Sequence, residues 1–353
     1  MAAEFHTLEV GSVDRLTDAS VAIRFAVPSE LRDAYRFVPG QHVIVRGVVG
    51  GEDVRRSYSI CTSANSGELR VAVKRLAGGA FSTFANTELT AGDRLDVTLP
   101  VGDFTITTAP GHARRYLAIA AGSGITPIMS MIATVLEDEP KSQFTLVFGN
   151  RDSMSVMFLD ELGALKDRYP SRLVLMHVLS RETNAIPLYD GRIDVAKLDE
   201  LFSTVIDADS IDGWYLCGPS GMVEAARKAL AARGVDEADI HDELFYAGDE
   251  VRAEIPADDP EGSTVRFTLN GRTSTLVIDP DGLPILDHAL SARPDAPFSC
   301  RSGACASCRA VVTEGEVRMD RNWALSDSEV ATGQVLTCQS HPVSETVELT
   351  YDL

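Results

Sequence analysis

The stretch PFSCRSGACASC, residues 297–308, holds three of the six cysteines of this chain within nine positions. A fourth cysteine, Cys338, follows in LTCQSHP, so the full pattern is C-x4-C-x2-C-x29-C. The residues between the first three cysteines are mainly Gly, Ala and Ser, and such small residues let backbone amides approach sulfur and donate hydrogen bonds to it. The pattern therefore predicts a site at which four thiolates converge.

This spacing is the one found around plant-type [2Fe–2S] clusters. The alternatives are a zinc site or a set of unrelated buried cysteines, but zinc sites usually combine two short C-x2–4-C hooks, and this stretch has one. We therefore expect a cluster with four ligands: Cys300, Cys305, Cys308 and Cys338. Neither of the other two cysteines is an expected ligand, and Cys61 is expected to be a small core residue.

Length and charge limit the class of protein. A chain of 353 residues suggests two or three domains. The net charge of −20 argues against a nucleic-acid partner, whose phosphates would be repelled. Most of this charge is expected to serve solubility, and the alternative is an acidic face that steers docking onto a basic protein partner. No long apolar run and no signal-peptide pattern is found, which predicts a cytoplasmic protein without a membrane contact.

Three sequence patterns follow one another along the chain. Residues 1–110 contain short alternating runs separated by turns, typical of an antiparallel β-barrel or sandwich. Residues 111–247 alternate strands with helices, typical of an α/β doubly wound sheet. Residues 248–262 are acidic, contain two prolines and lack periodicity, so we expect a linker. Residues 263–353 form a small α+β unit that opens with a hairpin turning at Asn270-Gly271 and continues with a short helix at 284–292.

Within residues 111–247 the apolar periodicity predicts individual elements. A helix is expected over 126–138, with Thr126 as its N-cap and Pro127 in its first turn. Further helices are expected over 158–166 and 221–234. The expected strands are residues 114–121, 144–150, 172–180 and 214–220.

Two motifs in the first domain are candidates for a phosphate-bearing cofactor. RRSYSICTS, residues 55–63, lies on an expected strand, and alone it could be an ordinary strand with an aromatic cross-strand pair. KRLAGGAFSTF, residues 74–84, places two glycines before hydroxyl side chains, a turn that exposes backbone N–H groups to a phosphate, although alone it could be a surface turn. Both motifs in this order are a stronger signal. The residues concerned are Arg56, Ser57, Tyr58, Ser59, Gly78, Gly79, Ser82 and Thr83.

Two motifs in the second domain are candidates for a dinucleotide site. AAGSGITPIM, residues 120–129, puts Gly122-x-Gly124-x-x-Pro127 between an expected strand and an expected helix, where a helix N-terminus binds a pyrophosphate. The motif ends in Pro rather than in the Gly of the dinucleotide fingerprint, so it depends on this strand–turn–helix context. YLCGPSGM, residues 215–222, ends a later strand of the same sheet, and ligands of such sheets bind at the carboxyl ends of strands.

Taken together, these motifs resemble the ferredoxin–NADP reductase superfamily, in the form with a fused C-terminal plant-type ferredoxin domain. The resemblance covers essentially the whole chain, because FVPGQHV, RSYSI, GGAFST, GSGITP, CGPSGM and the four cysteines occur in the family's order. It implies a β-barrel FAD domain over 1–110, a nucleotide domain over 111–247 and a β-grasp-like ferredoxin domain over 263–353. Within the family, the segment from Cys300 to Ser344 is most similar to reductase subunits that serve a di-iron epoxidase.

The resemblance implies a role for each motif. Tyr58 would stack on the isoalloxazine, Arg56 would contact the FAD pyrophosphate, and Gly79 and Ser82 would help to bind the FAD phosphates. The residues implied at the flavin–nicotinamide contact, and in that sense catalytic, are Ser59, Cys217 and Glu243. Phe245 matches the segment that returns to the flavin in relatives, although HDELFYAG, residues 241–248, could simply be the last strand of the sheet. The residues implied for the dinucleotide are Gly122, Gly124, Thr126, Pro127, Cys217, Gly218 and Pro219.

Ser180 and Arg181, in VLSRETN, match the pair that holds the 2′-phosphate in NADP-using relatives. Arginine suits a phosphate because its planar fork donates two hydrogen bonds. The alternative is an exposed loop arginine, so NADPH is the expected nucleotide and NADH stays possible.

The expected function is electron transfer from NADPH through FAD and a [2Fe–2S] cluster to an oxygenase component, di-iron or Rieske. The alternative of a different class is a redox-sensing flavoprotein that keeps its cofactors without useful turnover.

Overall fold

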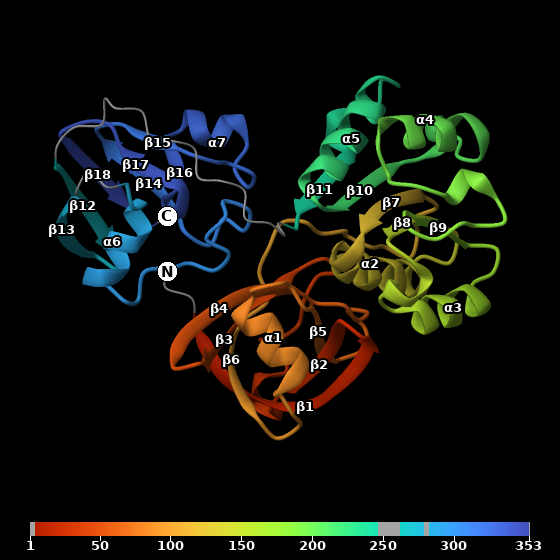
Figure 1. The fold of residues 1–353 in the computed structure, drawn as a ribbon, viewed down its shortest axis with the longest axis horizontal. Coiled ribbons are helices and arrows are strands. Elements are labelled where there is room, and N and C mark those ends of the chain that lie inside the picture. The colour runs from red at the N-terminus through yellow and green to blue at the C-terminus, as the bar shows by residue number, and fades with distance from the viewer. Residues whose placement is uncertain (1–3, 246–261, 279–281, 353) are drawn as a thin grey trace. The chain divides into compact units, whose positions relative to one another are not determined.

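The computed structural model describes residues 4–245, 262–278 and 282–352, and Figure 1 labels its elements. The chain divides into two compact units. One covers His6–Val54 and Tyr58–Ala247, and the other covers Gly248–Leu353 with the short segments Met1–Phe5 and Arg55–Ser57. All of the expected linker 248–262 except its last residue lies outside the described residues.

The first domain is a curled antiparallel sheet, as expected (Figure 1). Its strands lie in the order β4-β3-β6-β1-β2-β5 and alternate between the core and the surface. Leu8, Ile23, Val43 and Val71 are among the residues that fill its core. The bounds are β1 Phe5–Thr17, β2 Ser20–Ala26, β3 His42–Val49, β4 Glu52–Ser59, β5 Leu69–Lys74 and β6 Arg94–Thr98.

The turn with two glycines in this domain opens a helix that the alternation of short strands did not predict. Helix α1, Ala80–Thr87, starts after Gly79 and buries Phe81 and Ala85 in the barrel core. Gly78 has φ +73°, a left-handed conformation that glycine adopts easily. The segment is therefore the start of a helix, which places backbone N–H groups at its first turn.

The second domain is a five-stranded parallel sheet in the order β11-β10-β7-β8-β9. The chain order reverses between β7 and β10, which is where doubly wound sheets bind their ligands. The strands are β7 Arg115–Ala121, β8 Gln143–Asn150, β9 Leu173–Leu179, β10 Gly213–Gly218 and β11 Ile240–Leu244. The helices are α2 Ile125–Asp138, α3 Leu159–Arg168, α4 Val195–Thr204 and α5 Ser220–Ala231.

Two expectations for this domain were wrong in detail. Helix α2 begins at Ile125 with Gly124 as its cap, so Thr126 lies inside the first turn and is not the N-cap. The reason is a short 3-10 turn at Gly122–Gly124, which carries the chain from β7 straight into the helix. Helix α4 was not expected. Its N-cap is Asp194, which accepts a hydrogen bond from the Lys197 N–H, and aspartate at this position is a common sequence signal for the start of a helix.

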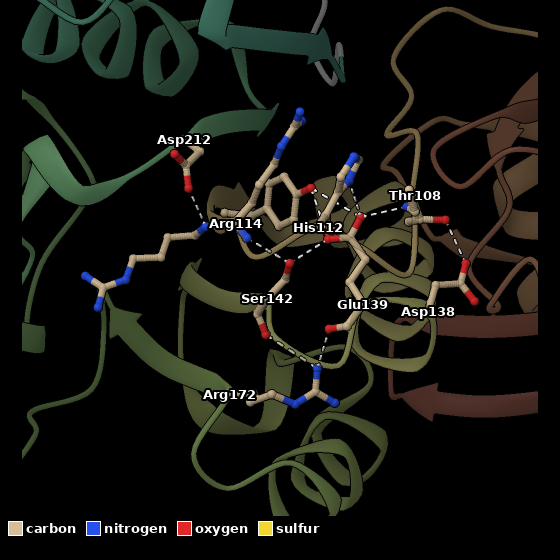
Figure 2. A network of polar contacts seen from close by, with 11 residues as sticks. Thr108, His112, Arg114, Asp138, Glu139, Ser142, Arg172 and Asp212 are labelled. Atoms are coloured by element: carbon tan, nitrogen blue, oxygen red, sulfur yellow. Dashed lines mark hydrogen bonds and ion pairs between the residues drawn. The ribbon is translucent and has the colours of Figure 1, made fainter.

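The amino edge of this sheet carries a network of polar contacts, shown in Figure 2. Glu139, which caps the end of α2, is fully buried. Its Oε1 accepts a hydrogen bond from the Ala109 N–H at 3.0 Å and lies 2.8 Å from His112 Nδ1. Its Oε2 accepts from Ser142 Oγ at 2.7 Å and from Tyr116 Oη at 3.2 Å. The network thus ties the segment that leaves the barrel to the start of the parallel sheet.

The barrel and the nucleotide domain also meet directly within the first unit. Arg70 on β5 forms a bidentate pair with Glu161 on α3, with the shorter distance 2.9 Å. Ala118, Ile125 and Phe148 share a core cluster with Cys61, whose side chain is buried as expected.

The C-terminal unit is a mixed sheet in the order β13-β12-β18-β14-β16, with α6 packed beside it. The hairpin β12–β13 turns at Asn270 and Gly271, both with positive φ, which confirms that prediction. The strands are β12 Ser263–Leu269, β13 Arg272–Ile278, β14 Arg309–Glu314, β15 Val317–Met319, β16 Gln334–Leu336, β17 Ser340–Pro342 and β18 Thr346–Thr350. The helices are α6 Ile285–Ala292 and α7 Asp327–Ala331.

None of the helices in the described part of the chain is long and apolar enough to cross a membrane.

Candidate flavin, nucleotide and iron–sulfur sites

The ends of β7 and β10 meet at the carboxyl edge of the parallel sheet. A Cβ atom on Gly124 would lie 2.1 Å from the carbonyl oxygen of Cys217, so only glycine allows this contact between backbones. Gly122, at the start of the turn, has φ +55°. The turn therefore brings the N-terminus of α2, with its unpaired N–H groups, against the end of β10. The structure places Gly122, Gly124, Thr126, Pro127, Cys217, Gly218 and Pro219 together at this edge.

Basic side chains surround this edge, and sequence reasoning missed one of them. Lys74, the last residue of β5 in the barrel, has its Nζ 3.1 Å from the position of a Cβ on Gly122. Burial lowers the pKa of Lys74, and the nearby Arg151 lowers it further. An ammonium beside another cation and a helix N-terminus is suited to bind a phosphate. The motif KRLAGGAFSTF contains Lys74, but its proximity to Gly122 depends on the fold.

Ser180 and Arg181 follow β9 at the same edge. The Ser180 N–H donates to the Asn150 carbonyl at 3.0 Å, and the Arg181 N–H donates to that of Arg151 at 2.7 Å. The side chains of both arginines are exposed. Arg151 and Arg181 thus lie on neighbouring chain segments, where each could contact an anionic ligand.

The candidate flavin residues lie at one end of the barrel. Tyr58 on β4 packs on Phe81 of α1 with ring centroids 5.5 Å apart. Gly79 caps α1, and the Ser82 hydroxyl donates to the Gly79 carbonyl at 3.2 Å. The Ser82 proton is therefore used locally in this structure, and the contact of Ser82 with an FAD phosphate stays a prediction. Arg56 and Ser57 lie on β4, Gly78 precedes the helix, and Thr83 is exposed on it.

A largely buried acidic side chain lies beside these residues. Glu243 on β11 accepts a hydrogen bond from Ser59 Oγ at 3.4 Å, and its Oε1 lies 3.8 Å from His42 Nδ1. Burial raises the pKa of Glu243 to about 8, whereas the Ser59 hydrogen bond opposes this rise. Burial lowers the pKa of His42 to about 4. Near neutral pH this pair is therefore a protonated carboxyl beside a neutral imidazole.

Cys217 and Phe245 complete this group. Burial raises the pKa of Cys217, and the Glu243 and Asp242 carboxylates raise it further, so the thiol stays protonated. The Phe245 N–H donates to the Gly218 carbonyl at 3.0 Å. The segment at Glu243 is indeed the last strand of the sheet, and it also brings its carboxyl group to Ser59. Sequence reasoning missed His42, although it lies in the quoted FVPGQHV.

The four cysteines of the C-terminal unit form two pairs. The Cys300 N–H donates to Cys305 Sγ at 3.4 Å, and the Ser302 N–H donates to Cys300 Sγ at 3.4 Å. Hydrogen bonding to Cys338, then burial, raises the pKa of Cys308, which makes those two the second pair. Arg301, Gly303 and Ala306 have positive φ, so the loop turns its amides toward the sulfurs.

Two pairs of thiols suit two iron atoms better than one zinc ion. Small residues and inward amides are the surroundings that stabilise thiolates around a cluster. The donor set thus fits a [2Fe–2S] cluster, which Cys300, Cys305, Cys308 and Cys338 would hold.

Family models match three successive parts of the chain. The oxidoreductase FAD-binding domain matches residues 7–106, and the oxidoreductase NAD-binding domain matches residues 118–228. The 2Fe-2S iron–sulfur cluster binding domain matches residues 267–343. These matches confirm the expected cofactors: FAD, a nicotinamide dinucleotide and a [2Fe–2S] cluster.

Full-length relatives share this arrangement. A component of the 1,2-phenylacetyl-CoA epoxidase of Escherichia coli K12 is 43% identical over 99% of this chain and 98% of its own length. The ferredoxin reductase component of the 3-ketosteroid-9-alpha-monooxygenase of Mycobacterium tuberculosis H37Rv is 36% identical over 98% and 95%. The solved structure of phthalate dioxygenase reductase, 24% identical, matches the fold with a TM-score of 0.61 over 98% of both chains.

Proposed function

Because this chain belongs to the ferredoxin–NADP reductase superfamily, in the group with a fused plant-type ferredoxin domain, we propose that it is the reductase component of a di-iron phenylacetyl-CoA epoxidase of phenylacetate breakdown. The main support for this proposal is the 43% identity to the epoxidase component over nearly the whole of both chains. The similarity of the segment from Cys300 to Ser344 to that group of reductases supports the same acceptor. The cytoplasm is the proposed compartment.

The chain is an oxidoreductase, and its three cofactors define an electron path. When bound, FAD would supply the chemistry that takes up a hydride as two electrons and passes them on singly, and the cluster would carry one electron at a time. The residues of the chain bind these groups, set their surroundings and exclude water. The two cysteine pairs would hold the irons, and the amides of residues 300–308 would donate hydrogen bonds to sulfur.

Residues at the flavin end would set which groups carry protons beside the bound flavin. The Glu243 carboxyl, protonated near neutral pH, can keep or give up one proton, while its Oε2 accepts a hydrogen bond from the Ser59 hydroxyl. Near neutral pH the protonated Cys217 thiol and the neutral His42 imidazole add no charge to the surroundings of Glu243. A lone charge there would be costly because the site is buried.

NADPH is the proposed electron donor. Arg181 is exposed at the end of β9, where its guanidinium could pair with a 2′-phosphate, and Arg151 and Lys74 add positive charge along the same edge. A phosphate that carries two negative charges benefits more from this charge than the 2′-hydroxyl of NADH.

A second candidate acceptor is a Rieske oxygenase. The 36% identity to the reductase component of a ketosteroid monooxygenase supports it, because the coverage of the two chains is nearly as complete. A redox-sensing protein without turnover is the remaining alternative, and the intact nucleotide motifs oppose it.

The first test is an anaerobic titration of the purified protein with NADPH and then NADH, followed by visible absorption and low-temperature EPR. We expect bleaching of the flavin and cluster bands, with a rhombic reduced [2Fe–2S] signal. A Cys338→Ser variant is the control, because its flavin should bleach without a cluster signal.

Electron transfer to purified oxygenases separates the acceptors. Faster NADPH oxidation coupled to the di-iron epoxidase than to a Rieske oxygenase supports the proposal, and the reverse order rejects it. Negligible reduction of any acceptor, including cytochrome c, would favour the redox sensor.

A further inference from the structure

Asn150, the last residue of β8, has a side-chain amide with no partner in the described part of the chain. Its Oδ1 and Nδ2 are both shielded from water, and within the described ranges neither atom has a hydrogen-bond partner. The residue as a whole is partly exposed, so the amide lies just below the surface. Burying an amide without hydrogen bonds is unfavourable, and most buried polar groups are paired. Asn150 therefore weakens the fold unless the amide has another use.

The strand register puts Asn150 in the middle of the proposed nucleotide site. Gly149 pairs with Ala121 on β7, and Asn150 pairs with Leu179 on β9. The residue after Ala121 is Gly122, which opens the turn into α2, and the residue after Leu179 is Ser180. A dinucleotide that reaches from the Gly122 turn to Ser180 and Arg181 must pass over the end of β8.

The Asn150 side chain also lies on the face of the sheet that α2 covers. Phe148 and Leu179 belong to the core that contains Ile125 and Ile128 of α2. A Cβ on Gly149 would meet Ile193, which belongs to the opposite core with α4 and α5. Because side chains alternate along a strand, Asn150 shares the α2 face with Phe148. The 3-10 turn Gly122–Gly124 packs near β8 on that face, next to the N-terminus of α2.

We propose that the Asn150 carboxamide binds the ribose–pyrophosphate part of the nicotinamide dinucleotide. Nδ2 donates to a phosphate or ribose oxygen, and Oδ1 accepts from a ribose hydroxyl. This part of the ligand presents acceptors and donors side by side, and a carboxamide offers the complementary pair of groups. The inference rests on the proposed nucleotide site and adds a residue that no motif in the sequence indicated.

The test compares NADP+ affinity with stability in the FAD- and cluster-loaded protein. Asn150→Ala should weaken NADP+ binding about tenfold, and Asn150→Asp should weaken it further because a carboxylate repels phosphate. Without nucleotide, the thermal midpoint of Asn150→Ala should stay equal or rise, because the variant removes an unpaired buried amide. The matched control is Gln143→Ala at the exposed amino end of the same strand, which should change neither quantity.

The NADP+ affinity and the thermal midpoint together show whether the Asn150 amide binds the ligand or stabilises the fold. Unchanged NADP+ affinity in Asn150→Ala and Asn150→Asp overturns the inference. A lowered thermal midpoint of nucleotide-free Asn150→Ala also overturns it, since the amide would then serve the fold. If the wild-type protein binds neither NADP+ nor NAD+, the proposed function fails first, and that outcome is visible before any variant is made.

Discussion

At the amino edge of the parallel sheet, the Glu139 side chain is fully buried, and Figure 2 shows its polar partners. At the carboxyl edge of the same sheet, both polar atoms of Asn150 are shielded and have no partner among the residues that the structure describes, and Lys74 lies partly buried beside Gly122. The two edges are built from the same strands. The difference teaches that a satisfied polar network supports the fold, whereas the amide of Asn150 gains from a ligand the partners that the fold does not supply.

The largest effect is expected from breaking the amino-edge network. Glu139→Ala leaves the buried Tyr116 hydroxyl, the Ser142 hydroxyl and the Ala109 N–H without their acceptor. It should lower the free energy of unfolding by about 3–5 kcal/mol, while the Kd for NADP+ stays unchanged. Chemical denaturation measures the loss. Asp212→Ala removes an exposed acceptor at the same edge and is the control; a similar loss in both variants would refute the distinction.

The next effect is a pH dependence that arises from Glu243. Burial raises the folded-state pKa of Glu243 to about 8, above its ordinary value of about 4.3. The folded state therefore binds more protons than the unfolded chain between those values, so stability falls as the pH rises through this window and levels off above about pH 8. The Glu243 side chain is 18% exposed, and we expect about 2–3 kcal/mol over the window.

Glu243→Gln should flatten this slope, because the amide keeps a neutral group beside Ser59. His42 has the opposite effect on stability, because its pKa of about 4 lies below the ordinary value of about 6.5. The stability that His42 contributes is therefore lost as the pH falls from about 6.5 to 4. Denaturation at several pH values checks both. An unchanged slope in Glu243→Gln would show that another group titrates.

A smaller effect is expected at the far end of the carboxyl edge. Arg181→Ala should raise the Kd for NADP+ about 10- to 100-fold and leave that for NAD+ unchanged, because only NADP+ carries a 2′-phosphate. Calorimetric titration with both nucleotides measures this. Arg115→Ala, an exposed arginine at the amino edge, is the matched control. Equal losses for the two nucleotides would place Arg181 elsewhere in the site.

The smallest effect is expected for Lys74. Lys74→Met should weaken NADP+ and NAD+ alike by about tenfold, because the pyrophosphate is common to both. The thermal midpoint should not fall, since burial disfavours the ammonium. Arg75→Ala, the exposed neighbour, is expected to bind both nucleotides normally. Discrimination between the nucleotides by Lys74→Met would argue against a pyrophosphate contact.

Features with local causes could be predicted from the sequence. The spacing of the four cysteines, the glycines of the 122–124 turn and the Asn270-Gly271 hairpin each reflect a constraint on a few neighbouring residues. Helix α1 was missed because it is short and rich in Ser, Thr and Asn, which are weak helix formers. The domain boundaries and the role of each site residue stay predictions.

Residues whose role depends on distant partners could not be predicted. Ser59 and Glu243 are 184 positions apart in the chain. Lys74 comes from the barrel, yet it lies beside a turn of the nucleotide domain, and Glu139 lies 30 positions from Ala109 and 23 from Tyr116. Asn150 has no local motif at all, and its position follows from the strand register.

The contact between Gly124 and the Cys217 carbonyl has a consequence for how nucleotide preference can evolve. That end of the proposed site is made of backbone, so any side chain at residue 124 would force β7 and β10 apart. The opposite end consists of exposed side chains after β8 and β9, including Arg151 and Arg181, which can change without disturbing the core. Under the proposed function, substitutions at these exposed residues could therefore change the preference between NADPH and NADH while the backbone contact at the other end stays unaltered.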